Sequence, residues 1–240
     1  MAAQHVTAPG MIERLVNKQR RIVWATLILL SLIVLVSFTI RLLVDVPNIV
    51  SGNVPGPHAF ERRYVLHPLA AYLHVVPSVV FLIGAPFQLS RRFRARHLAL
   101  HRMMGRILVP IGLLAGVMAL VVGVWFPYGG AFEATATVAF GAYFVAALGS
   151  GFLAIREGDV ARHRRWMIRA FAVAVGVGTV RIWIGLFELV GLLAIQDNAG
   201  KSWFGVAFWL AFSLHALAAE AYLAARPMTV GRAAADPRAA

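Results

Sequence analysis

The sequence predicts an all-α membrane protein, a polytopic bundle of six transmembrane helices. Six apolar stretches are long enough to cross a hydrocarbon core of roughly 30 Å as helices of about 20 residues or more. They cover residues 22–44, 67–89, 103–126, 134–155, 166–195 and 203–224. Hydrophobic residues make up 60% of the 240-residue chain and charged residues only 14%, which leaves too little polar surface for a water-soluble fold.

The first stretch, 22–44, is interpreted as a retained helix rather than a cleaved signal peptide. It exceeds the roughly 7–15 apolar residues of a signal-peptide core, and no small-residue cleavage pattern lies near Ser37 to Arg41. The polar segment 1–21 precedes this helix. The connection 45–66 follows it and contains three prolines, so we expect an irregular cap over the outer mouth of the bundle.

The distribution of basic residues predicts the topology. Arginines and lysines concentrate in segment 1–21, in the second and fourth connections and in the tail 226–240. The third connection, 127–133, has none, and the fifth, 196–202, has only Lys201, although Arg62 and Arg63 in the first connection are exceptions. By the positive-inside rule, both termini lie in the cytoplasm. The tail 226–240 is expected to be disordered.

Composition also narrows the function. The net charge of +13 does not predict nucleic-acid binding, because the basic residues lie at the ends of apolar stretches and the lipid bilayer is the expected partner. The absence of cysteine excludes disulfides and iron–sulfur clusters. No phosphate-binding glycine loop, HExxH or GxSxG motif supports a hydrolytic or ATP-driven enzyme. Many arginines and alanines are typical of a GC-rich bacterium, so we expect a bacterial inner membrane.

An internal repeat predicts how the helices are arranged. A basic connection followed by a helix that opens with His-Arg occurs at 96–106 and again at 159–169. The hairpin 67–126 would then correspond to the hairpin 134–195, as parallel repeats around an axis along the membrane normal. The sequence therefore predicts a four-helix core built as a duplicated hairpin, with the first and last helices outside it and residues 22–225 as one transmembrane domain.

Several motifs between residues 67 and 183 are shared with a known family. They are the spaced His67 and His74, His101-Arg102-x-x-Gly105-Arg106, Gly158-Asp159-Val160-Ala161-x-His163-Arg164-x-Trp166-Met167-x-Arg169 and Thr179-x-Arg181-x-Trp183. In these motifs the chain resembles a bacterial family of membrane proteins that is catalogued as a domain of unknown function. The resemblance implies a multi-pass bundle and brings no established activity.

Two histidines at the expected cytoplasmic end point to a cofactor. His101 and His163 would face each other across the core if the four helices pack in sequential order. Two facing imidazoles can ligate a haem b, an arrangement similar to the membrane b-type cytochromes, and Arg106 and Arg169 could pair with its propionates. No metal other than haem iron is predicted. The alternative is that these residues only anchor the helix ends among lipid headgroups.

A second set of ionisable residues lies toward the expected outer side. His67 and His74 are two helical turns apart, about 10 Å along one face, so they cannot ligate one metal together. Arg181 interrupts an apolar run and cannot discharge itself by deprotonation. Its candidate partners are Glu133 and Glu188. Either a structural ion pair or a substrate or proton site would explain it, and His215 in the last helix could belong to the same path or form a simple hydrogen bond.

Three functional hypotheses follow. The leading one is a haem-binding or quinone-linked electron-transfer bundle, because histidines occupy matched positions of a duplicated hairpin. The second is a small-molecule or proton-coupled transporter that uses Arg181, His74 and Glu188. The third is a non-catalytic module that helps to assemble another membrane protein, in which the polar residues are structural.

Overall fold

The computed structural model describes residues 9–192 and 198–225, and within these ranges the chain contains helices and no strand. Six helices are long and apolar enough to cross a membrane, which confirms the predicted fold class. Residues 1–8, 193–197 and 226–240 lie outside the described ranges, and with them the predicted disordered tail.

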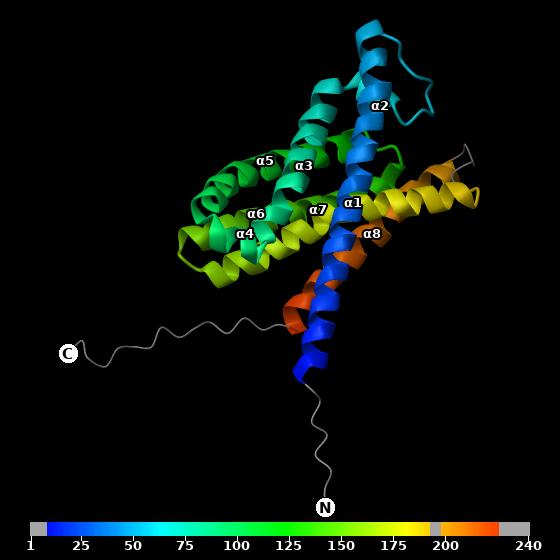
Figure 1. Cartoon of the computed structure of the whole chain (residues 1–240). Helices are drawn as coiled ribbons and strands as arrows, with labels where there is room; N and C mark the ends of the chain where they lie inside the picture. The colour runs from blue at the N-terminus through cyan, green and yellow to red at the C-terminus, as the bar shows by residue number, and fades with distance from the viewer. Residues whose placement is uncertain (1–8, 193–197, 226–240) are drawn as a thin grey trace, which may run out of the picture.

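The six long helices and two short ones follow one another along the chain (Figure 1). The long helices are α1 (Pro9–Ser51), α3 (Pro68–Leu89), α5 (Leu98–Trp125), α6 (Gly130–Arg156), α7 (Val160–Leu189) and α8 (Asn198–Ala225). The short helices α2 (Arg62–Leu66) and α4 (Arg91–Arg96) lie in connections. Most long helices extend into the basic flanks of the apolar stretches, because long basic side chains can reach the headgroups while the backbone remains helical.

Helix α1 continues beyond its predicted end. The sequence predicts irregular chain from Asp45, but the helix runs to Ser51. Arg41 forms an ion pair with Asp45 one turn later, and the Asn48 side chain donates to the Val44 carbonyl. These contacts satisfy polar groups within the last turns, so Pro47 does not end the helix. Only the part between α1 and α2 is irregular.

Helix α7 ends earlier than its apolar stretch predicts. The stretch reaches residue 195, but the helix ends at Leu189. Gly191 has φ +77°, and the amide of Leu192 donates to the Phe187 carbonyl at 2.9 Å. This left-handed glycine termination satisfies carbonyls at the helix end. The composition stays apolar past that point, which is why hydropathy alone does not reveal the end.

Four of the long helices pack side by side in sequential order, the condition under which His101 and His163 lie on diagonal helices. Helix α3 packs on α5, α5 on α6, and α6 on α7, while α7 also contacts α3 and closes the ring. Within the described residues the diagonal helices α5 and α7 do not contact each other. Helix α8 packs on α6 and α7 and contributes Ala207, Ala211 and Phe212 to the buried core, so it does not lie outside the core as predicted. Helix α1 crosses α7 and touches α3 (Figure 1).

The starts of four long helices are evenly spaced along the chain. Helix α3 begins at residue 68 and α6 at 130, while α5 begins at 98 and α7 at 160, so both pairs of starts are 62 residues apart. His101 and His163 are consequently each the fourth residue of their helix.

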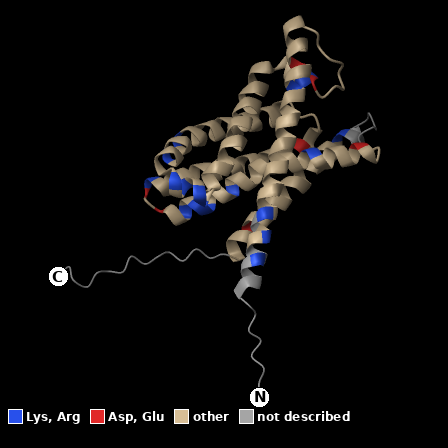
Figure 2. Ribbon diagram, viewed as in Figure 1, with Lys and Arg blue, Asp and Glu red and all other residues tan. Residues whose placement is uncertain are grey.

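Charge distinguishes the two ends of the bundle. Figure 2 shows many lysines and arginines around α4 and the start of α7, and more along the N-terminal part of α1. We call this the basic end. The opposite end, called the α2 end below, holds α2 and the connection between α5 and α6.

A glycine allows α1 to cross α7 closely. A Cβ atom on Gly178 would lie 2.8 Å from the backbone oxygen of Leu30, and Leu30 itself is buried. Because the obstacle is backbone rather than a flexible side-chain end, any larger residue must move a helix.

We expect Gly178→Ala to lower the thermal unfolding temperature of the protein in detergent, with a cost of about 1–3 kcal/mol typical of overpacking. Gly185→Ala in the same helix is the control, because a Cβ there meets nothing within 4 Å. That variant should be neutral or gain up to about 1 kcal/mol from helix propensity. Equal unfolding temperatures for the two variants would contradict the close crossing.

Candidate ligand-binding cavity

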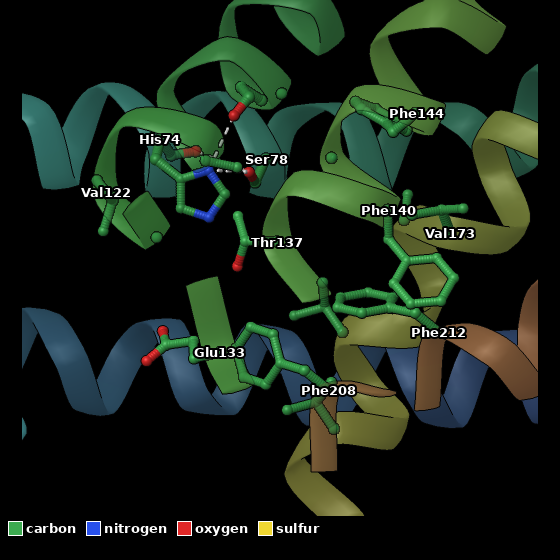
Figure 3. A pocket seen from close by; sticks show the side chains of 18 of the residues that line it. His74, Ser78, Val122, Glu133, Thr137, Phe140, Phe144, Val173, Phe208 and Phe212 are labelled. Atoms are coloured by element: carbon green, nitrogen blue, oxygen red, sulfur yellow. Dashed lines mark hydrogen bonds between the residues drawn. The ribbon is translucent and has the colours of Figure 1, made fainter. Parts of the chain in front are cut away.

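A cavity of about 180 Å³ lies among the helices toward the α2 end. Most of its wall is apolar, and Phe140, Phe144, Phe208 and Phe212 are among its phenylalanines (Figure 3). The polar residues that line it are Arg63, Tyr64, His74, Ser78, Glu133, Thr137 and Arg181. A mostly apolar pocket with a few convergent polar groups is the usual form of a small-molecule site.

An ion pair between α2 and α6 borders the cavity. Arg63 Nη1 lies 2.8 Å from Glu133 Oε1 and also donates to the Phe126 carbonyl at 3.3 Å. The second oxygen of Glu133 accepts from the Gly129 amide at 2.6 Å. Burial opposes the charge of Arg63, but Tyr64 and Glu133 raise its pKa above the ordinary value. Both charges therefore have partners although Glu133 is only 2% exposed.

A second charged cluster holds α1 to the α2 segment. Arg41 bonds to Asp45 at 3.3 Å and to Glu61 at 2.8 Å. Asp45 is completely buried, and the Tyr72 hydroxyl lies 3.5 Å from it. Burial is the largest single influence on Glu61 and would raise its pKa, but the hydrogen bond and charge of Arg41 together with a backbone hydrogen bond outweigh burial and hold that pKa below the usual value. Glu61 is therefore a carboxylate at neutral pH.

His74 on α3 presents one ring nitrogen to the cavity. Its Nδ1 lies 2.9 Å from the Ala115 carbonyl on α5, and a carbonyl can only accept, so Nδ1 carries the proton. In the neutral ring, Nε2 is then an acceptor, and it bonds to no described residue. Figure 3 shows the imidazole directed into the cavity on the side of Thr137.

Arg181 on α7 lies at the cavity wall without a partner in the described ranges. Its Nε is buried and makes no hydrogen bond, and no ion pair involves its guanidinium. Glu133, one predicted partner, pairs with Arg63 instead. Glu188, the other, is exposed and lines a different cavity of about 270 Å³, which Arg181 also borders.

Two further histidines from the predicted path do not line either cavity. His67 joins α2 to α3, and its ring stacks on Phe126 with the centroids 3.7 Å apart. His215 on α8 lies with Nε2 2.7 Å from the Thr179 hydroxyl on α7. Both contacts connect neighbouring segments, which favours structural roles for these two residues.

The histidines predicted as haem ligands lie at the basic end. His163 Nδ1 is 2.8 Å from the Gly151 carbonyl, which leaves its Nε2 available, and His101 Nδ1 is buried without a hydrogen-bond partner among the described residues. Arg106 is exposed. Arg169 forms a two-pronged ion pair with Glu220 of α8, at 2.6 and 2.8 Å, so its guanidinium is already occupied. The described residues hold no group of three or more His, Cys, Asp or Glu suited to a metal ion.

Sequence reasoning missed the charged clusters of the α2 end. Arg63 was assigned to an irregular loop, and Arg41 and Asp45 were placed at the boundary of the first apolar stretch. The spacing of four residues between Arg41 and Asp45 on an apolar helix could have revealed their ion pair, since residues four apart lie on the same helix face. The contact between Arg63 and Glu133 joins residues 70 positions apart, and no local pattern encodes it.

The six apolar helices and the partly polar cavity define the chain as a polytopic membrane protein with an internal pocket. Residues 71–223 match the family described as "Predicted membrane protein (DUF2306)", and the chain belongs to this family. The match covers the four-helix core and most of α8, and it confirms the resemblance seen in the sequence motifs. Neither the curated proteins nor the solved structures include a match.

We expect Glu133→Gln to destabilise the protein by about 3 kcal/mol or more, because it leaves the buried charge of Arg63 without its partner. The double variant Arg63→Met with Glu133→Gln should recover part of this loss. Thermal unfolding in detergent measures both. If the single variant matched the wild type, the ion pair would not stabilise the α2 end.

Proposed function

We propose that this integral membrane protein binds a quinone in the cavity at the α2 end. The observation that carries the proposal is Arg181, which borders an apolar cavity and whose buried Nε makes no hydrogen bond to a described residue. A buried donor that remains unpaired costs about 1–3 kcal/mol, and more when it is charged. A ligand that accepts a hydrogen bond at this point recovers that cost.

A quinone suits the shape and chemistry of the wall. Its flat apolar ring can pack against phenylalanines such as Phe140 and Phe208. One carbonyl oxygen can accept from Arg181. The reduced form carries a hydroxyl that can donate to Nε2 of His74, because Nδ1 already holds the ring proton.

The charge balance favours a neutral ligand over an anion. The ion-paired and cavity-lining charges at the α2 end include Arg41, Arg63 and Arg181 with Asp45, Glu61 and Glu133, and these six groups carry no net charge when all are ionised. Arg62, which is also half-buried, lines neither cavity and donates to the Pro55 carbonyl. An anion would add an unbalanced charge in a medium of low dielectric, where its desolvation is costly. This reasoning ranks quinone binding above the transport of an anionic substrate.

We further propose that the α2 end faces the outer side of a bacterial inner membrane, with both termini in the cytoplasm. The basic end carries α4 and the turn between α6 and α7, and it is rich in arginine (Figure 2). The positive-inside rule places such an end in the cytoplasm.

The test is a binding titration of a short-chain ubiquinone analogue and of menadione to the purified protein in lipid nanodiscs, followed by tryptophan fluorescence. Arg181→Leu should weaken binding about 10- to 100-fold, the range expected for a hydrogen bond to a charged group of roughly 1.5–3 kcal/mol. Arg181→Gln keeps a hydrogen-bond donor, so its affinity for the quinone should lie between those of the wild type and Arg181→Leu.

Arg169→Gln is the matched control, since Arg169 lies on the same helix, pairs with Glu220 and does not line the cavity. It should bind the quinone as the wild type does. Unchanged affinity in Arg181→Leu would refute the assignment. Binding of a carboxylate, and of neither quinone, would favour the transporter hypothesis instead.

A haem b at the basic end is a second candidate, favoured by one observation. His101 and His163 occupy equivalent positions on diagonal helices of the duplicated core, and the Nδ1 bond of His163 to Gly151 leaves its Nε2 free to ligate iron. Bound haem would supply one-electron transfer. The residues of this chain would hold the iron and fix the ring orientation of His163.

An oxidised-minus-reduced visible spectrum of protein purified from haem-sufficient cells tests this second candidate. Sharp α and β bands are expected in the wild type and should disappear in His101→Ala and in His163→Ala. His58→Ala, in the connection before α2, should leave the bands unchanged. Bands that persist in both ligand variants would exclude this pair as ligands.

A further inference from the structure

A second cavity, of about 270 Å³, lies beside the first at the α2 end. Its walls come from α1 and α7, with contributions from α8 and from two connections. Five of its nine lining residues are polar: Ser37, Arg41, Tyr128, Arg181 and Glu188. The first cavity has only seven polar residues among twenty-six. The second cavity is therefore the more polar of the two.

The path of α1 explains why this space exists. The two helices touch at Leu30 and Gly178, where the backbones approach closely. Toward the α2 end, Ser37 and Arg41 on α1 and Ile184 and Glu188 on α7 border the second cavity instead of packing together. The helices thus separate beyond their crossing, and the cavity fills the angle between them.

Three residues border both cavities: Phe60, Arg181 and Phe204. The rings of Phe60 and Phe204 are 5.4 Å apart, and Arg63 and Arg41 lie over the Phe60 ring at 4.3 and 5.0 Å. Phe60 is therefore held between two guanidinium groups, each of which is fixed by a carboxylate. This arrangement leaves Arg181 as the polar group at the junction.

From these contacts we infer that the second cavity is a water-filled vestibule, which connects the aqueous phase at the α2 end with Arg181. A polar cavity of this size holds water when several groups can bond to it. Water here would solvate the part of the guanidinium that borders the second cavity, and desolvating a charge without such a partner is costly. The vestibule gives protons and small solutes access to the junction while the phenylalanines keep the first cavity apolar.

The exposed carboxylate of Glu188 supports this direction of access. It borders the vestibule about two helical turns beyond Arg181, and it is the penultimate residue of α7, where a carboxylate is expected to meet water rather than lipid. The inference does not require that a quinone occupies the first cavity, because it depends only on the lining of the second.

Cysteine accessibility can test the vestibule directly, because the natural chain has no cysteine to remove. Two matched pairs sample both walls. On α7, Ile184→Cys lines the cavity, while Ile182→Cys, whose native side chain is 48% exposed on the surface of the bundle, lies at a similar depth. On α1, Ser37→Cys lines the cavity and Val36→Cys, with a native exposure of 57%, is its control.

The labelling rate of each variant is measured with a charged, membrane-impermeant methanethiosulfonate reagent on protein in nanodiscs, so that both faces are reachable. Asn53→Cys, in the exposed connection after α1, gives the rate for a fully aqueous thiol. Only the thiolate reacts with the reagent, and burial in lipid raises the thiol pKa by roughly two pKa units or more. Cysteines that line the cavity should therefore react on the order of 100-fold faster than their lipid-facing controls.

Ile184→Cys and Ser37→Cys reacting within about tenfold of Asn53→Cys would establish the vestibule, since each pKa unit changes the thiolate fraction about tenfold. Rates equal to those of Ile182→Cys and Val36→Cys would overturn it and identify a dry or lipid-filled gap. Size-exclusion profiles like that of the wild type exclude misfolding as the cause. The assay contains no quinone, so its outcome is independent of the quinone titration.

Discussion

The structure of the α2 end depends on ion pairs that neutralise its buried and half-buried arginines. The ion pair of Arg63 with Glu133 joins α2 to α6, and that of Arg41 with Glu61 joins the segment before α2 to α1. These contacts also hold Phe60 in place. The boundary between the two cavities therefore rests on paired arginines, and Arg181 differs from its neighbours in having no such pair within the described ranges.

Much of the fold could be predicted from hydropathy alone. A helix that crosses a membrane must satisfy its own backbone, so length and apolar composition nearly determine where the six helices lie. The basic connections and the repeat also indicated which helices form the core. Ends were less predictable, because they depend on local hydrogen bonds. Arg41 with Asp45 extends α1, and the left-handed Gly191 ends α7 inside an apolar stretch.

The candidate site was predictable in some of its members and not in its pairs. The rule that ionisable residues in a membrane helix need an explanation selected His74, Glu133 and Arg181, and the structure brings all three to one cavity. Which carboxylate neutralises which arginine depends on packing between distant segments. Glu133 forms an ion pair with Arg63. Glu220 forms an ion pair with Arg169, which the sequence analysis expected to contact a haem propionate. Arginine and glutamate side chains are long enough to reach several neighbours, so the sequence alone does not determine which of them form ion pairs.

The equal spacing of the helix starts allows the two hairpins to be compared position by position. With an offset of 62 residues, the position equivalent to His74 in the second hairpin is Ala136, and the position equivalent to Glu133 in the first is Ala71. Both alanines are buried and carry no polar group. At these positions the imidazole is present only in the first hairpin and the carboxylate only in the second. A hairpin paired with a copy of itself would therefore hold two of one group and none of the other.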